Sequence, residues 1–321
     1  MQAQLIIEHG GPDRLTWSEV PEPTPGPTDL LVDVTASGVN FIDTYHREGR
    51  YPVSLPFVPG VEGAGTVLAV GARAEGFAPG DRVAWCLSPG GYAERAVVPV
   101  AQATRIPDGV ADELAAAVLL QGLTAHYLAF DTFPLSPTDT CLVHAGAGGV
   151  GLLLIQLATD AGARVHATTS TPEKAALAMD AGAVAVHEYG SFVETIQEHE
   201  GTDRPLDVVY DGVGATTFEA GLSLLRPRGL MTLFGAASGP VPPFDLQALN
   251  THGSLYVTRP TLHAYVSTPH ELRTRATDVF SRVAAGTLDV RIGARFPLSD
   301  AADAHRALEG RETTGKVLLL P

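Results

Sequence analysis

The sequence predicts an α/β protein with two domains, one rich in β-strands and one built on a doubly wound parallel sheet. Three observations support this prediction. The chain has 321 residues, which is longer than most single domains and favours two. The first hundred residues read as extended segments separated by glycine and proline turns. After Thr138, short strands and helices alternate with short connections, as in a parallel sheet covered by helices.

The N-terminal part is expected to consist mainly of strands. Residues 21–27 hold four prolines in seven positions, which fits an extended connector and not a helix. Apolar and polar residues alternate over 30–34, as they do in a half-buried strand. Glycine-containing turns then separate further extended segments. These later segments are 60–71, 83–86 and 92–98.

A helix rich in alanine and leucine opens at Asp112, and the alternating part follows it. Thr171 is expected to cap the helix that begins at Pro172. The predicted strands are 140–145, 163–169, 184–188, 206–211, 230–235 and 254–258. The predicted helices are 151–161, 172–182, 191–199 and 216–226. The tail, 271–321, adds helices and a last strand at 317–320, and we expect it to return to the first domain.

Composition argues against several classes of protein. The formal charge is −15, from 21 basic and 36 acidic residues, so neither a nucleic acid nor a membrane is an expected partner. Two cysteines, Cys86 and Cys141, cannot form a disulfide framework in a chain this long. No signal peptide is visible, and the apolar stretch 141–158 is interrupted by glycines. We therefore expect a soluble, cytoplasmic protein.

The segment Gly146-Ala-Gly148-Gly149-Val150-Gly151 matches the pattern G-x-G-x-x-G between a predicted strand and a predicted helix. Glycines at such a turn let the backbone approach a pyrophosphate closely. The helix that follows offers unpaired N–H groups and the positive end of its dipole. Gly148, Gly149 and Val150 are therefore candidate cofactor ligands. The alternative is a glycine-rich turn that serves only the packing of helix against strand.

The end of the second strand of this block selects between the two nicotinamide cofactors. Sites that prefer NAD place Asp or Glu there to bind the ribose 2′-hydroxyl. This chain has Thr168, Thr169 and Ser170 instead, and Lys174 follows in the first turn of the next helix. Hydroxyl groups and an ammonium suit a 2′-phosphate, so the sequence predicts NADPH. The alternative for Lys174 is a solvated helix residue paired with an acidic neighbour.

Only two of the 21 basic residues are lysines, Lys174 and Lys316, and the other 19 are arginines. A codon bias explains this count, but it does not explain where the two lysines lie. Lys174 lies where a compact ammonium could meet a phosphate. Lys316 precedes the predicted last strand, and the sequence assigns it no role.

Several segments together resemble a known family. They are Gly-Val-Asn40-Phe-Ile-Asp43-Thr-Tyr45, Gly49-Arg-Tyr51-Pro, Ala145 to Gly151, Tyr210-Asp-Gly-Val-Gly214, Gly229-Leu-Met, Phe234-Gly235 and Gly253-Ser-Leu-Tyr-Val-Thr-Arg-Pro260. Over essentially its whole length the chain is similar to the zeta-crystallin-like quinone oxidoreductases. That family belongs to the medium-chain dehydrogenase/reductase superfamily.

The resemblance implies an architecture of two domains. A GroES-like catalytic domain, 1–121 and 262–321, would surround an NADP-binding Rossmann domain, 122–261, with the active site in the cleft between them. The family is usually homodimeric, and the strand 254–258 would pair across the two-fold axis.

The resemblance also assigns site residues. The residues at the adenosine 2′-phosphate would be Lys174, Tyr189 and Arg311. The positions along the dinucleotide would be Thr124, Gly149, Val150, Phe234, Gly235 and Ala236. The residues around the nicotinamide and the substrate would be Asn40, Tyr45 and Tyr51.

The expected reaction is the NADPH-dependent reduction of a quinone. We expect the nicotinamide near Val213 and Gly235, where Tyr45 and Tyr51 offer flat walls and a hydroxyl for an aromatic substrate. Ordinary half-buried packing is the alternative for both tyrosines. Asp43 could cap or orient the loop that carries Asn40.

No metal is expected. Zinc alcohol dehydrogenases of the superfamily need a Cys shortly after residue 38 and a His before Glu62, where this chain has Asn40 and Val61. The scattered histidines show no ligand spacing, and packing is their expected role; they are His126, His144, His166 and His187.

Two other functions stay open. One is a zinc-free 2-alkenal or enone reductase, which uses the same fold and cofactor on a conjugated C=C bond. The other is a nonenzymatic NADPH-binding protein, since zeta-crystallin itself serves as a bulk structural protein.

Overall fold

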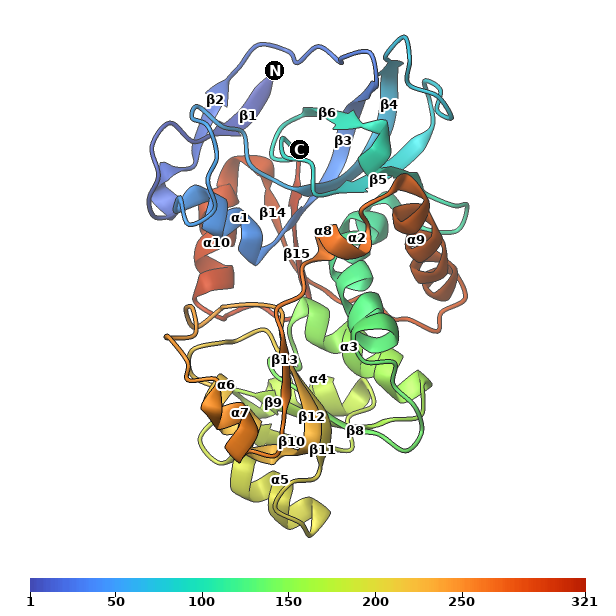
Figure 1. The fold of residues 1–321 in the computed structure, drawn as a ribbon. Helices are drawn as coiled ribbons and strands as arrows, with labels where there is room; N and C mark the ends of the chain where they lie inside the picture. Colours follow the sequence, from blue (N-terminus) through green and yellow to red (C-terminus); the bar gives the residue numbers. More distant parts are fainter. The chain divides into compact units, whose positions relative to one another are not determined.

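The computed structural model describes every residue from Met1 to Pro321. The chain folds into two compact units (Figure 1). Unit 1 comprises Met1–Leu123 and Tyr265–Pro321, and unit 2 comprises Thr124–Ala264. Unit 1 is rich in strands, and unit 2 is a parallel sheet covered by helices, so the predicted fold class is confirmed.

Unit 1 contains a seven-stranded sheet in the order β14-β15-β3-β4-β5-β7, with β6 paired to β3, and a separate pair, β1 and β2. Its strands are β1 (Gln2–Leu5), β2 (Thr16–Glu19), β3 (Asp29–Val39), β4 (Glu62–Val70), β5 (Arg82–Cys86), β6 (Arg95–Pro99), β7 (Ala103–Arg105), β14 (Ile292–Pro297) and β15 (Lys316–Leu320). Its helices are η1 (Pro12–Arg14), α1 (Phe41–Arg47), η2 (Val100–Gln102), α9 (Pro269–Ala284), η4 (Leu298–Asp300) and α10 (Ala301–Glu309). The two unit boundaries fall within α2 (Asp112–Tyr127) and α8 (Leu262–Tyr265).

Strand β3 runs on to Val39, whereas the alternating pattern predicted its end at residue 34. Its last residues pair antiparallel with β15, so the C-terminal tail is hydrogen-bonded into the sheet of the N-terminal residues. Gly38 is required in this stretch. A Cβ atom there would lie 2.5 Å from a carboxylate oxygen of Glu62 and 2.6 Å from Cε of Lys316.

Two other strands of unit 1 differ from the prediction. Strand β6 begins at Arg95 and not at residue 92, because Tyr92 is fully buried and bonds through its backbone to Pro59 outside the ladder. Strand β14 was not predicted, since it contains Gly293 and ends at Pro297, both weak strand formers. It runs parallel to β15 at the edge of the sheet, where a terminal proline is tolerated.

Unit 2 is a six-stranded sheet in the order β10-β9-β8-β11-β12-β13, and every pair in it is parallel. Its strands are β8 (Thr140–Val143), β9 (Arg164–Thr169), β10 (Ala185–Glu188), β11 (Leu206–Asp211), β12 (Leu225–Leu233) and β13 (Tyr256–Thr258). Its helices are η3 (Leu128–Thr132), α3 (Gly149–Asp160), α4 (Pro172–Asp180), α5 (Phe192–Glu200), α6 (Phe218–Leu224) and α7 (Gln247–Thr251). The buried strand residues Leu142, Val209 and Met231 pack against Phe192 and Phe218 from the helices.

The predicted helix 216–226 is wrong at its C-terminal end. Strand β12 already begins at Leu225, which is fully buried and pairs with Leu206 of β11. Arg226 donates to Asp207 at 2.5 Å and fixes this start. Strand β13 is shorter than predicted, because Ser254 has a φ of 58° and leaves the extended conformation.

One apolar segment is long enough to cross a membrane, and it is not the one the sequence drew attention to. Residues 141–158 form a strand, a turn and part of a helix, as expected. The longer apolar run is Asp112–Thr132, formed by α2 and η3, with a mean hydropathy of 1.2 in its most apolar stretch. In the fold, 67% of that stretch is buried, as in the core helix of a globular protein.

Candidate functional site

The glycine loop of unit 2 lies between β8 and α3, as predicted. Gly146 and Gly151 are needed for packing: a Cβ atom would lie 2.8 Å from Cβ of Ala167 at the first and 2.3 Å from the Ala145 carbonyl at the second. Gly148 is the N-cap of α3 and offers no side-chain cap. The packing alternative therefore explains part of this motif.

The other part of the motif is free for a ligand. No acceptor within the protein is found for the backbone N–H groups of Gly149, Val150 and Gly151. They are the first N–H groups of a twelve-residue helix, where the helix dipole favours an anion. The loop thus combines close packing with open donors, as a phosphate cradle requires.

The end of β9 brings the predicted hydroxyl and ammonium groups together. Thr168 and Thr169 are buried, while Ser170 is exposed. The ammonium of Lys174 lies 3.5 Å from the hydroxyl of Ser170. Thr171 caps α4 as predicted, by accepting the N–H of Lys174 at 3.3 Å. The strand end itself carries no carboxylate at Thr168, Thr169 or Ser170, the position where NAD-preferring sites have one.

Tyr189 follows β10 and reaches across to the glycine loop. Its hydroxyl accepts the N–H of Ala145 at 3.1 Å, and its ring stacks on His144 at 6.2 Å between centroids. Burial lowers the pKa of His144 to about 4, so the ring is neutral and bonds Thr168 at 2.9 Å. His144 therefore packs in the interior and supports Tyr189, but it lies just after β8, which ends at Val143, whereas the predicted strand 140–145 included it.

The loops after β11 and β12 lie against one another at the same edge of the sheet. The carboxylate of Asp211 accepts the N–H groups of Val213 at 2.7 Å and of Gly214 at 2.9 Å. A Cβ atom on Gly235 would lie 2.5 Å from the carbonyl of Gly212, so the second loop needs glycine to approach the first. The predicted residues of these loops are thereby brought together; they are Val213, Phe234, Gly235 and Ala236.

Two predicted cofactor residues lie elsewhere. Thr124 is buried in the last turn of α2. Arg311 belongs to unit 1, in the turn between α10 and β15, where its φ is 60°. Their predicted roles stay predictions.

Tyr45 and Tyr51 form an aromatic pair in unit 1. Their rings meet edge to face, with 5.4 Å between centroids, and the N–H of Tyr51 donates to the carbonyl of Tyr45 at 3.2 Å. The guanidinium of Arg50 lies 5.5 Å from the Tyr45 ring. Tyr45 is buried and Tyr51 is 41% exposed, so the pair combines a fixed wall with an accessible hydroxyl.

Asn40 is placed by the start of α1. Its backbone N–H donates to the carboxylate of Asp43 at 2.9 Å, so Asp43 holds the turn as expected. The amide side chain is buried and points to two charged groups. Its Nδ2 donates to Glu62 at 2.9 Å, and its Oδ1 accepts from the ammonium of Lys316 at 2.8 Å.

Lys316 and Glu62 contact the candidate residue Asn40, and the sequence reasoning assigned neither of them. Lys316 is the first residue of β15 and does not precede it, and its ammonium lies 2.5 Å from Glu62 Oε2. Both side chains have almost no exposure. The other oxygen of Glu62 accepts the N–H of Leu120 at 2.6 Å. The sequence did contain a signal for Lys316. It is one of only two lysines in the chain, and it opens a strand whose other residues are apolar.

A second buried network supports Asp43. The fully buried guanidinium of Arg47 binds Glu309 at 2.7 Å and donates to Nδ1 of His305 at 2.9 Å. His305 therefore carries its proton on Nε2 and donates to Tyr92 at 3.0 Å, and Tyr92 donates to Asp43 at 3.3 Å. Burial raises the pKa of Asp43 to about 7 and lowers that of His305 to about 3.

The residues expected to replace zinc ligands, Asn40 and Val61, lie close to Glu62 in unit 1. Val61 offers no ligand, and the ammonium of Lys316 lies between Glu62 and Asn40. The one group of at least three close metal-ligating side chains lies in unit 2, at His166, His199 and Glu200.

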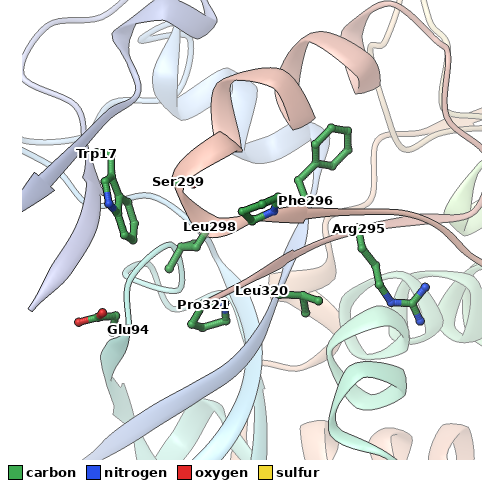
Figure 2. Close-up of a pocket in the computed structure, with 9 residues that line it drawn as sticks. Trp17, Glu94, Arg295, Phe296, Leu298, Ser299, Leu320 and Pro321 are labelled. Atoms are coloured by element: carbon green, nitrogen blue, oxygen red, sulfur yellow. The ribbon is translucent and has the colours of Figure 1, made fainter.

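A surface pocket of unit 1 does not contain the predicted residues. It has a volume of about 520 Å³ and is mostly apolar (Figure 2). Trp17 and Glu94 lie on one side of it and Arg295 on the other, around Leu298 and Pro321. None of the residues predicted for the cofactor or the substrate lines it.

Comparisons with known proteins cover the whole chain. The model of the alcohol dehydrogenase GroES-like domain matches residues 26–108, and that of the zinc-binding dehydrogenase matches residues 149–280. Quinone oxidoreductase of Pseudomonas aeruginosa is 44% identical over 98% of this chain and 97% of its own length. The 2-haloacrylate reductase of a Burkholderia species is 38% identical over 100% and 99%. The crystal structure of Escherichia coli quinone oxidoreductase complexed with NADPH has a TM-score of 0.97 at 40% identity, covering 100% of both chains.

The ion pair of Lys316 yields a prediction. Lys316→Met leaves Glu62 as an unpaired buried charge, so we expect the free energy of unfolding to fall by about 3–5 kcal/mol. Adding Glu62→Gln removes that charge and should restore much of the loss. Lys174→Met, on a surface helix, is the control and should stay within about 0.5 kcal/mol of the parent. Denaturant titration at neutral pH measures all three. A single variant as stable as the parent would contradict the assignment.

Proposed function

We propose that this chain, which belongs to the quinone oxidoreductase family of the medium-chain dehydrogenase/reductase superfamily, is an NADPH-dependent quinone oxidoreductase. The similarity to its relatives spans nearly their full length, so it includes both units. Within the chain, one observation carries the proposal. The edge of the unit 2 sheet combines open N–H donors with Ser170 and Lys174, and no carboxylate stands at the end of β9.

The residues of unit 2 fit NADPH. The N–H groups of Gly149 and Val150 would bind the pyrophosphate, and Ser170 and Lys174 would bind the 2′-phosphate. Tyr189 would lie beside the 2′-phosphate, since its hydroxyl already accepts the N–H of Ala145 at the start of the glycine loop. Thr124, the loops around Val213 and Phe234, and Arg311 complete the proposed set. The Escherichia coli relative was solved with NADPH, which supports this choice.

The chain's own residues would bind and orient the substrate. When bound, NADPH supplies a hydride, and the protein supplies positioning and hydrogen bonds. Tyr45 offers a fixed aromatic wall, and the accessible hydroxyl of Tyr51 would donate to a quinone oxygen. Asn40 acts as a positioning residue, because both ends of its amide are bound to Lys316 and Glu62.

We also propose that this reaction needs no zinc. A quinone is already electrophilic and requires little Lewis-acid help. The sequence has Asn40 and Val61 at the two positions where the zinc enzymes need Cys and His, and neither side chain supplies a thiolate or an imidazole. The matching family model carries the description of a zinc-binding dehydrogenase, but this chain lacks those ligands in unit 1.

A second candidate is the reduction of a C=C bond conjugated with a carbonyl. It is favoured by a relative named 2-haloacrylate reductase, which is 38% identical to this chain. The same cofactor and the same aromatic pair would serve it. The two candidates differ in the acceptor and not in the cofactor.

We further propose a cytoplasmic homodimer. Strand β13 is an edge strand of the unit 2 sheet, and Tyr256 and Val257 on it are 62% and 40% exposed. An open edge with large exposed apolar side chains invites pairing with a second copy. Pairing of two β13 strands would join two six-stranded sheets.

The first test is a panel of acceptors followed by the absorbance of NADPH. We expect ortho- and para-quinones to be reduced faster than enals, enones or haloacrylates. Tyr51→Phe should lower kcat/KM for quinones about tenfold, through loss of one hydrogen bond to the substrate. Tyr256→Phe, an exposed tyrosine of unit 2, is the matched control. Faster haloacrylate turnover would favour the second candidate, and binding of NADPH without turnover of any acceptor would refute both.

The second test concerns cofactor choice. Lys174→Ala should weaken NADPH binding about tenfold, because a charge-assisted bond to the 2′-phosphate is lost, and should leave NADH binding unchanged. Glu173→Ala, its exposed neighbour, is the control. Calorimetric titration gives both dissociation constants. Equal loss for the two cofactors would place Lys174 outside the phosphate site.

The third test concerns the dimer. Tyr256→Asp would bring two carboxylates together near the proposed two-fold axis and should shift the protein to monomers. Val184→Asp, an exposed position beside β10 at the opposite edge of the sheet, should leave the dimer intact. Sedimentation velocity measures both. A parent protein that is already monomeric would end this proposal.

A further inference from the structure

Three histidines and a glutamate meet at the outer edge of the unit 2 sheet. His166 lies on β9 and His187 on the edge strand β10, while His199 and Glu200 end α5. The spacing of these residues in the sequence gave no sign of a shared site, and packing was the expected role of the first two. The fold brings all four within contact.

The ligating atoms converge on one point. Nε2 of His166 and Nδ1 of His199 each lie 3.0 Å from Oε1 of Glu200. One ligand atom from each of the three residues lies within 4.8 Å of the other two. A tetrahedral zinc ion with bonds of about 2.0–2.2 Å needs its ligand atoms roughly 3.3 Å apart. Small side-chain adjustments therefore suffice to admit an ion.

A chain of hydrogen bonds behind His166 is compatible with metal binding through its Nε2 atom. If Nε2 of His166 binds a metal, its neutral ring carries the proton on Nδ1. Nδ1–H then donates to Nε2 of His187 at 2.9 Å, and Nδ1–H of His187 donates to the hydroxyl of Thr195 at 2.8 Å. Thr195 in turn donates to the carbonyl of Ser191 at 2.9 Å. Every hydrogen in this chain has an acceptor, as outer partners of metal-bound histidines usually provide.

The cluster is buried on one side and open to solvent on the other. The side chain of His166 is fully buried, that of Glu200 is 14% exposed and that of His199 is 39% exposed. An ion could reach the site from solvent and would keep room for a water ligand. One group opposes it: the guanidinium of Arg164 lies 2.7 Å from Oε1 of Glu200. That side chain is half exposed and can turn outward.

We propose that His166, His199 and Glu200 form a site for a divalent transition metal of the zinc class, with His187 and Thr195 fixing the tautomer of the buried ligand. Two imidazoles and one carboxylate suit zinc, cobalt or nickel better than magnesium or calcium. The site lies in unit 2 and shares no residue with the proposed quinone or NADPH contacts. A protein that contains zinc would therefore still be consistent with zinc-free quinone reduction.

Zn²⁺ and Co²⁺ are the probes for this site. We expect the 321-residue protein to bind one equivalent of Zn²⁺ and to give the visible absorption of tetrahedral Co²⁺. His199→Ala and Glu200→Gln should weaken Zn²⁺ binding by more than the roughly 10- to 100-fold that loss of an outer partner costs. His270→Ala, an exposed histidine of unit 1, is the control. Equal binding by His199→Ala and the parent, or no binding by the parent, would overturn the proposal.

Two further measurements separate a metal site from a plain hydrogen-bond cluster. In a protein labelled at histidine with ¹⁵N, added Zn²⁺ should move the proton of the His187 ring from Nε2 to Nδ1, since the chain from His166 reverses. Arg164→Ala should raise the affinity for Zn²⁺, because it removes a competing cation from Glu200. A ring tautomer that ignores Zn²⁺, or an affinity that falls in Arg164→Ala, would show that the cluster only packs.

Discussion

The buried ion pair of Lys316 and Glu62 is the interaction on which unit 1 depends. Two side chains with almost no exposure meet at 2.5 Å, and such a pair is stable only when each charge finds further partners. Glu62 also accepts the N–H of Leu120, and Lys316 also donates to Asn40. The pair therefore joins β15, β4, α2 and the start of α1. Gly38 leaves the space that both side chains occupy.

In unit 2, the geometry of the backbone brings the candidate cofactor residues together. Parallel strands that share one sheet end at the same edge, so the segments after β8, β9, β10, β11 and β12 become neighbours. Close contacts then fix them. Gly151 lets α3 begin against the glycine loop, Gly235 lets the loop after β12 reach the loop after β11, and Asp211 holds Val213. The candidate cofactor residues follow from this order rather than from any one motif.

The two units differ in the source of positive charge at their carboxylate clusters. In unit 1, the buried ammonium of Lys316 lies between the carboxylate of Glu62 and the amide of Asn40, so the positive charge is part of the chain. In unit 2, imidazoles and a carboxylate meet at the sheet edge, far in sequence from the glycine loop. A metal content measured for the whole protein would therefore say little about the reaction until its site is known.

The sequence by itself determined the α/β class, the glycine loop between a strand and a helix, the Thr171 cap, and the cluster of Ser170 and Lys174. All of these are local, because turns, caps and strand ends are specified by residues a few positions apart. Only the tertiary structure brought Lys316 to Glu62, and His199 and Glu200 to His166. Their partners lie in distant segments, and burial sets their energetics. The predicted helix 216–226 was wrong at its last two residues for the same reason. Leu225 pairs with β11, and this long-range pairing overrides the local helix preference.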